Sequence, residues 1–148
     1  MESTFKFKRA TLLSTDEAES LLTKKEKAYH DWWWLRSPGM YQHYAANVTS
    51  GGSVNYYGDR VNYVYDCVRP ALIINLKSSN YKIGDTFKFG NKAFKIISDN
   101  SAFCLEDIGT HCFREDPEAP DANDYDASDV KKFIDAWFEK TLKEESEV

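Results

Sequence analysis

Residues 33–39 read WWLRSPG, in which three large apolar residues run through an arginine into a Ser-Pro-Gly turn. This much apolar surface needs a partner surface in the core. The chain offers one near its end, where apolar residues recur at helical spacing: Val130, Phe133, Ile134, Trp137, Phe138 and Leu142. We predict that this amphipathic helix packs on the stretch, and that it buries together Trp34, Leu35, Phe133 and Trp137.

A strand and a short helix are predicted ahead of this stretch. Residues 5–13 have the length and composition of a strand. Ser14 stands three residues ahead of Glu17, which is the spacing of a capping box. A helix over residues 14–28 should therefore follow the strand directly.

Two hairpins are predicted after the stretch. Val48 and Val54 flank a Ser-Gly-Gly turn, and Gly90-Asn91 separates two apolar segments within residues 81–97. A further strand over residues 102–108 follows the second hairpin. Together with the helices, these patterns predict an α+β fold.

Length and composition favour one domain. The chain has 148 residues, 42% of them hydrophobic, and a mean hydropathy of -0.60. No apolar run approaches the roughly 20 residues of a membrane span, and the first residues lack a secretory profile. The three cysteines have no CxxC spacing, which fits a reducing compartment. We expect a cytoplasmic chain without a membrane partner.

The acidic segment before the last helix contains the only calcium-like spacing. Asp124, Asp126 and Ser128 alternate as at the start of a calcium loop, but Asp129 stands where an EF-hand needs glycine. Acidic residues just ahead of a helix also stabilise its positive end. We expect these residues to cap the helix and no metal to bind.

The cysteines and histidines form no recognisable catalytic or zinc-binding motif. His111 and Cys112 with Cys104 lack a fourth zinc ligand at suitable spacing. Cys67 lies within an apolar strand pattern and has the character of a buried small residue. We predict no catalytic residues, no metal and no cofactor, and therefore no enzyme.

Three motifs in the first half of the chain carry a family resemblance. They are the segment ATLLSTDEAESL at residues 10–21, WWLRSPG at 33–39 and VRPAL at 68–72. The chain resembles a bacterial and phage domain of unknown function that couples these motifs. In that family, two further motifs come first. Here FGNKAFKII at 89–97 and SDVKKFIDAWF at 128–138 look like those two, in circularly permuted order.

The resemblance implies an architecture similar to C-type lectins and formylglycine-generating enzymes. That is a single α+β domain with mixed or antiparallel sheets and two helices. It would span residues 1–148, with one half at 1–76, a second half at 81–143 and a frayed tail at 144–148. Because the connector over residues 77–82 is short, we predict that the strand around VRPAL pairs with the strand that carries Phe87 and Phe89.

The signature motifs contain two arginines, each with two possible roles, and one proline that bears on the position of its strand. Arg36 and Arg69 could hold loops through backbone carbonyls or a carboxylate such as Asp66, or they could bind a ligand. Pro70 indicates that the VRPAL strand lies at a sheet edge or contains a bulge.

The loops between Met40 and Arg60 concentrate tyrosine with glycine, serine and asparagine, a mixture typical of binding surfaces. We predict a non-enzymatic recognition module whose partner is a protein or a glycan. The sequence leaves its oligomeric state open. The candidate contact residues are Tyr41, His43, Tyr44, Tyr56, Tyr57 and Arg60.

Local acidity supports an alternative function. The formal net charge is -5, and residues 115–129 contain seven acidic side chains and no basic one, so this surface should repel nucleic acid. A small phage-type inhibitor could use it to occupy the basic site of a host defence or nucleic-acid-binding enzyme. The residues of that surface would be Glu115, Asp116, Glu118, Asp121, Asp124 and Asp126.

Overall fold

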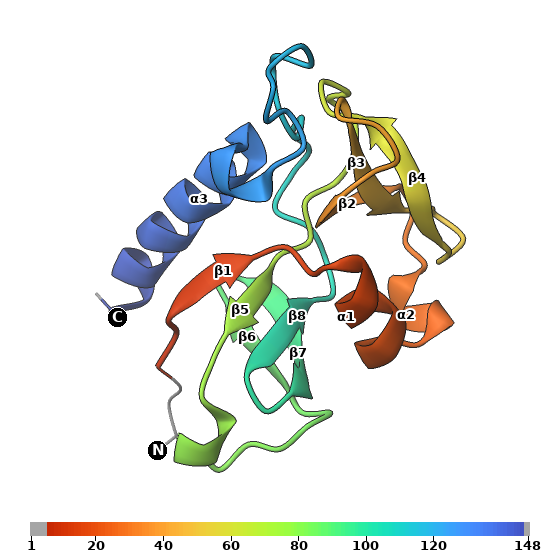
Figure 1. Ribbon diagram of the computed structural model, residues 1–148. Coiled ribbons are helices and arrows are strands. Elements are labelled where there is room, and N and C mark those ends of the chain that lie inside the picture. The colour runs from red at the N-terminus through yellow and green to blue at the C-terminus, as the bar shows by residue number, and fades with distance from the viewer. Residues whose placement is uncertain (1–5, 147–148) are drawn as a thin grey trace.

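Two antiparallel sheets organise the computed structural model, which describes residues 6–146 (Figure 1). The five-stranded sheet has the order β1-β5-β8-β7-β6, and the three-stranded sheet has the order β2-β3-β4. The strands are β1 (Arg9–Thr11), β2 (Trp33–Pro38), β3 (Tyr44–Val48), β4 (Val54–Arg60), β5 (Ala71–Ile73), β6 (Thr86–Phe89), β7 (Lys92–Ser98) and β8 (Ser101–Cys104). The predicted α+β class is confirmed.

Three α-helices and two short 3₁₀ turns complete the fold. The elements are α1 (Thr15–Leu21), α2 (Lys24–Lys27), η1 (Leu76–Ser78), η2 (Tyr125–Ala127) and α3 (Asp129–Ser146). In Figure 1, α1 and α2 lie near β7 and the three-stranded sheet, whereas α3 lies on the other side, alongside β1.

The predicted helix over residues 14–28 is two helices. Ser14 begins α1 with a complete capping box, as predicted. A second capping box, formed by Thr23 and Glu26, starts α2. Because Thr23 satisfies the amide of Glu26 with its side chain, the chain turns at that point and a new helix begins.

Both predicted hairpins form. Val48 pairs with Val54 in the β3–β4 hairpin, and Phe89 pairs with Lys92 in the β6–β7 hairpin. At the second turn, Gly90 and Asn91 have φ values of 61° and 64°, as a two-residue hairpin turn requires. A Cβ at Gly90 would lie 2.5 Å from Thr141 Cγ2, so α3 packs directly on this turn.

The predicted pairing of the VRPAL strand is wrong. β5 pairs with β1 and β8, while β6 lies at the far edge of the same sheet beyond β7. The chain after η1 passes to that edge instead of reversing onto β5. The sheet edge that Pro70 suggested is also wrong, because β5 lies between β1 and β8, and neither pairing of β5 contains a bulge. Pro70 precedes β5, so it removes no donor from the ladder, and its carbonyl accepts from Cys104 N at 2.9 Å.

The first strand is shorter than predicted. β1 covers three residues of the range 5–13, and Phe5 lies outside the described residues. Ahead of β1, Phe7 packs on Phe89 with ring centroids 4.8 Å apart. The segment just ahead of β1 thus reaches β6 by aromatic contact.

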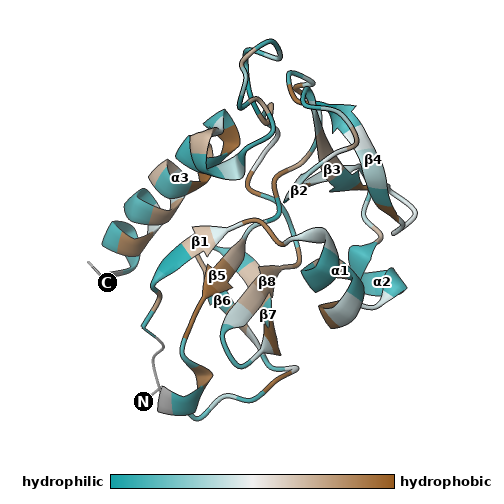
Figure 2. Ribbon diagram, in the orientation of Figure 1, coloured by the Kyte–Doolittle hydropathy of each residue, from teal (hydrophilic) through white to brown (hydrophobic). Residues whose placement is uncertain are grey.

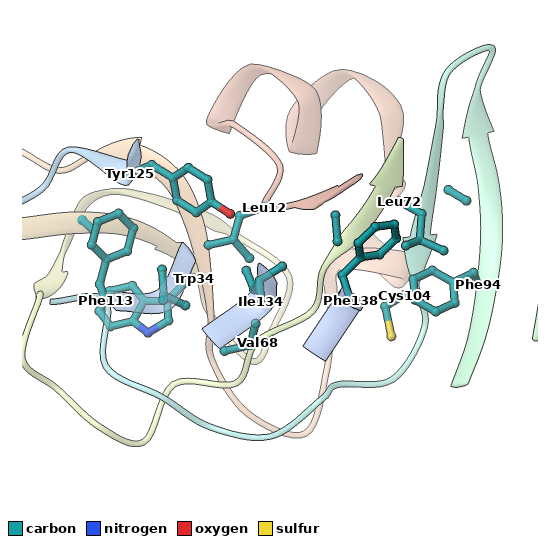
Figure 3. Packing of buried hydrophobic residues seen from close by; sticks show 14 of the residues in the cluster. Leu12, Trp34, Val68, Leu72, Phe94, Cys104, Phe113, Tyr125, Ile134 and Phe138 are labelled. Carbon is teal, nitrogen blue, oxygen red and sulfur yellow. The ribbon is translucent and has the colours of Figure 1, made fainter. Parts of the chain in front are cut away.

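The core has two parts, and consecutive residues of β2 divide between them. Trp34 belongs to the cluster that includes Ile134 and Phe138 of α3 (Figure 3). Phe133 and Trp137 pack against this cluster in partly buried positions. Leu35 belongs to the cluster that includes α1. The predicted burial of all four residues together is therefore wrong: Trp34 is buried, Phe133 and Trp137 are partly buried against the same cluster, and Leu35 lies in the other cluster. Neighbouring side chains of a strand point to opposite faces, which separates Leu35 from Trp34.

The amphipathic helix is confirmed and is longer than predicted. It buries Val130, Ile134, Phe138 and Thr141, and Figure 2 shows apolar residues recurring along it among polar ones. Residues 144–146 continue α3 where a frayed tail was expected, and residues 147–148 lie outside the described part of the chain. Leu142, assigned to the apolar face, is exposed.

Arg69 joins the two sheets at the centre of the molecule. Its side chain is buried, and its guanidinium carbon lies 4.9 Å from the ring centroid of Trp33 in β2 and 4.5 Å from that of Phe103 in β8. Tyr29 contributes a third ring at 4.4 Å. The guanidinium also donates to the carbonyls of Glu26 and Glu106. Burial lowers the pKa of Arg69 to about 10, so the group stays charged at neutral pH.

Replacing Arg69 by lysine should destabilise the fold. A lysine keeps the charge but cannot spread a planar cation over three rings, so we expect Arg69→Lys to lower the free energy of unfolding by about 2 kcal/mol or more. Urea unfolding measures the difference. The exposed Arg60→Lys is the matched control and should stay within about 0.5 kcal/mol of the wild type. Equal stability of the two variants would contradict a joining role for Arg69.

Candidate functional site

Four aromatic rings gather beside the loop between β2 and β3: two come from the loop, one from the start of β3 and one from β4. We call Tyr41, His43, Tyr44 and Tyr57 the tyrosine cluster. The ring centroid of Tyr57 lies 5.8 Å from that of Tyr41 and 5.3 Å from that of Tyr44, and His43 lies 4.7 Å from Tyr44. Tyr41 is 49% exposed and Tyr57 46% exposed, so the cluster faces solvent while its members support one another.

The signature turn builds this cluster. Gly39 N donates to Tyr44 O at 2.9 Å, and Met40 N donates to Tyr57 O at 2.9 Å, so the loop after Pro38 is fastened to both neighbouring strands. A Cβ at Gly39 would lie 2.5 Å from Tyr57 O, which only glycine avoids. The last residue of WWLRSPG therefore determines where the cluster lies.

Two of the predicted contact residues lie outside the cluster. The hydroxyl of Tyr56 donates to Glu19 Oε2 at 3.2 Å, which places this ring beside α1. Arg60 ends β4 opposite Tyr44 in the register, and its side chain is exposed. Of the six predicted residues, the structure thus brings four together and sets Tyr56 apart, with Arg60 at the margin.

The acidic loop lies directly against the tyrosine cluster. Gln42 Nε2 donates to Ala119 O at 3.0 Å, and Asn123 Nδ2 donates to Tyr41 O at 3.1 Å. Figure 1 shows the loop that leads into α3 reaching the β2–β3 loop. The two surfaces that the sequence offers as alternatives are therefore parts of one surface.

All six predicted acidic residues of this loop are exposed, and some have structural partners. Asp121 forms an ion pair with Arg114 at 3.1 Å, and Asp116 accepts from the amide of Glu118. Asp124 accepts from the amide of Asp126 at the start of η2. The calcium-like spacing thus serves turns and a helix start, and Ser128 caps α3 by accepting from Lys131 N.

The two signature arginines contact backbone carbonyls, as the structural interpretation predicts. Arg36 donates to Leu12 O at 2.7 Å and pairs with Glu17 at 2.6 Å. Partial burial raises the pKa of Glu17, but its hydrogen bonds with Arg36 and Ser14 outweigh burial and hold it below the usual value. Arg36 therefore ties β2 to the capping box of α1.

Asp66 partners neither arginine, which corrects the suggestion that its carboxylate holds them. It is 1% exposed, and its Oδ2 accepts from Asn47 Nδ2 at 2.8 Å. Asn47 Nδ2 also donates to Asp59 at 2.7 Å, so one amide joins two carboxylates. Burial, reinforced by the charges of Asp59 and Asp31, raises the pKa of Asp66 to about 7.

The cysteines have the environment of buried residues. All three are free and buried. Burial, with nearby carboxylates, raises the pKa of Cys67 to about 12, so this group is a thiol at neutral pH. Among residues 6–146, no group of three or more histidine, cysteine, aspartate or glutamate side chains has an arrangement that could hold a metal ion.

One comparison identifies relatives of the first half of the chain. A family described as a domain of unknown function (DUF6273) matches residues 3–76, which contain the LLS, WWLRSPG and VRPAL motifs. No curated protein matches the chain. No solved structure matches it either. Within the described residues, every helix is too short or too polar to cross a membrane.

The raised pKa of Asp66 predicts a pH-dependent stability. Between the ordinary 3.8 and about 7, the folded chain keeps a proton that the unfolded chain has released. Stability should therefore fall as pH rises through this window, by up to about 1.4 kcal/mol per pH unit, and then level off. Asp66→Asn keeps an acceptor for Asn47 but does not titrate, so its stability relative to the wild type should rise with pH. Urea unfolding across the window measures this difference, and parallel profiles would contradict it.

Proposed function

The chain belongs to the DUF6273 family of domains of unknown function, and we propose that it is a non-enzymatic recognition module that binds a protein or a glycan through the tyrosine cluster. The observation that carries this proposal is the mutual support of four rings at an exposed loop. Tyrosine rings that are already ordered lose little entropy when a partner covers them. A surface of this kind is suited to recognition.

The chemistry of the other polar groups favours binding over catalysis. The guanidinium of Arg36 already donates to the Leu12 carbonyl, and that of Arg69 is already stacked on buried rings such as Phe103. The Cys67 thiol is protonated at neutral pH, so it is a poor nucleophile. Three free buried cysteines also favour a protein of the reducing cytoplasm.

The order of the two halves supports a circular permutation of the lectin-like architecture. The family match ends at residue 76, yet its strand β5 is completed by β8 from the second half. A domain made of residues 3–76 alone would leave that strand edge open. We propose that the motifs at residues 89–97 and 128–138 correspond to the two elements that other members of the family carry ahead of the LLS motif.

The acidic loop favours a second candidate function. Its exposed carboxylates adjoin the tyrosine cluster, so a phage-type inhibitor could present both to the basic site of a host enzyme. The two functions differ in salt dependence. Binding through the carboxylates should weaken steeply with added salt, and binding through the rings should not.

Tyr56 and Tyr57 provide a matched pair for the test, because they are adjacent and similarly exposed but only Tyr57 belongs to the cluster. The wild type, Tyr57→Ala and Tyr56→Ala are used to capture ligands from a bacterial lysate and on a glycan array. We expect a ligand that Tyr57→Ala loses and Tyr56→Ala keeps, with binding weakened by more than about 1 kcal/mol. Isothermal titration calorimetry with the identified ligand measures this loss.

Reversing the charge of three aspartates in the acidic loop tests the inhibitor function against the aromatic one. Lysine at Asp121, Asp124 and Asp126 should change the affinity of that ligand little if the rings dominate. Loss of binding in this triple variant together with unchanged binding by Tyr57→Ala would replace the aromatic function by the inhibitor function. Circular dichroism and urea unfolding verify that each variant is folded.

A further inference from the structure

A pocket lies just ahead of β2, and none of the residues of the tyrosine cluster lines it. It is a pocket of about 340 Å³ lined by Asp31, Trp32, Asp59, Tyr63 and Asp66. Three of the five lining residues are carboxylates and two are aromatic. No lysine or arginine is among the described residues that line it. The pocket therefore combines negative charge with π-faces.

The carboxylates of this pocket have hydrogen bonds but no counter-charge. Asp59 Oδ2 and Asp66 Oδ2 both accept from Asn47 Nδ2, and Asn47 Oδ1 in turn accepts from Asn55 Nδ2 at 3.0 Å. Asp31 accepts from the amide of Trp32. The ion pairs found within residues 6–146 include none of these three aspartates.

Asp66 is the group that points most directly to a ligand. It is 99% buried, since only 1% of its surface is exposed, yet it lines the pocket. Its side chain receives one hydrogen bond from the described residues, on Oδ2, which leaves Oδ1 without a donor. Burial raises the pKa of Asp66, so the ionised carboxylate is costly in this position even with its hydrogen bond from Asn47, and a cation in the pocket would offset that cost.

The aromatic residues are positioned to contact the same cation. Desolvation raises the pKa of the Tyr63 hydroxyl, and the charges of Asp66, Asp59 and Asp31 raise it further, so all three carboxylates act on this ring. Trp32 forms the other aromatic wall and is half-buried. Tryptophan and tyrosine faces attract ammonium and guanidinium groups.

The size and geometry of the pocket select an organic cation over a metal ion. The three aspartates are not arranged as a metal-binding group. The volume is that of a small molecule or a single side chain, far larger than a bare ion needs. We propose that this pocket binds an organic cation, an alkylammonium or guanidinium group, between Trp32 and Tyr63 with its charge on Asp59 and Asp66.

Butylammonium chloride and propylguanidinium chloride are suitable probes for the full chain, with sodium chloride at equal concentration as the reference. Two-dimensional NMR follows the indole N–H of Trp32 and the backbone amides of Tyr63 and Asp66. We expect saturable shifts at these residues with either probe and none with sodium chloride. Shifts that do not saturate, or a calcium chloride titration that saturates at lower concentration, would overturn the proposal.

Neutral variants separate the pocket from general charge effects. Measured well above pH 7, where Asp66 is ionised, Asp59→Asn and Asp66→Asn should each weaken binding of the probes about tenfold or more, because each removes a contacting charge. Asp126→Asn removes one exposed charge elsewhere and is the matched control, expected to bind as the wild type does. An equal loss in Asp126→Asn would reduce the effect to net charge and overturn the site. Tyr57→Ala should leave probe binding unchanged, so this test is independent of the proposed function.

The source of the cation is resolved with short peptides. Blocked Ala-Arg-Ala and Ala-Lys-Ala are compared with blocked Ala-Gln-Ala. If a basic peptide binds at least about tenfold tighter than butylammonium or propylguanidinium, the site exists and its ligand is a lysine or arginine side chain of a polypeptide. If the basic peptides and the free cations bind equally tightly, the site exists and its ligand is a free amine or guanidine. Binding of the glutamine peptide as tightly as the basic ones would overturn the charge requirement.

Discussion

The stacking of Arg69 among three rings is the interaction on which the arrangement of the two sheets depends. Trp33 comes from the three-stranded sheet, Phe103 from the five-stranded sheet and Tyr29 from the segment after α2. One planar cation can contact all three, and its N–H groups donate to the carbonyls of Glu26 in α2 and Glu106 after β8. Removing a buried charge from such a site leaves polar carbonyls and ring faces without a partner, so the site accepts few other residues.

The residues of the three family motifs contact one another and hold the first half of the chain together. Arg69 of VRPAL meets Trp33 of WWLRSPG, and Arg36 of WWLRSPG meets Glu17 and the carbonyl of Leu12 in the LLS segment. Each motif is thus the partner of another, and together they fix β1, β2, β5 and the helices between them. The exposed Tyr41 lies in the loop that follows WWLRSPG, and the exposed Tyr57 lies in β4, where the backbone of that loop is hydrogen-bonded to it.

Local patterns predicted the elements well, because hairpin turns, capping boxes and helical spacing are encoded within a few residues. Partners of strands were not predictable in this way: β5 pairs with β8, thirty residues further along, and no local pattern encodes that choice. The sequence predicted that the candidate site lies between Met40 and Arg60, but it did not predict which of the six contact residues come together. Period-two alternation could have separated Tyr56 from Tyr57, whereas the contact of the acidic loop with Tyr41 and the burial of Asp66 depend on the tertiary structure.

The hydrogen bonds from Gln42 to Ala119 and from Asn123 to Tyr41 join loops from the two halves of the chain. One loop comes from the half that the family match covers, and the other lies between β8 and α3. The exposed positions of the second loop can therefore vary in composition while the motif-bearing half stays intact, whereas Ala119 and Ala122 are buried in the core. In engineering terms, the exposed positions of this loop are the natural ones to randomise in a display library: Glu115, Asp116, Glu118, Pro120 and Asp124. Ala119, Ala122 and Asn123 would be kept, because they hold the loop in the core and against the tyrosine cluster.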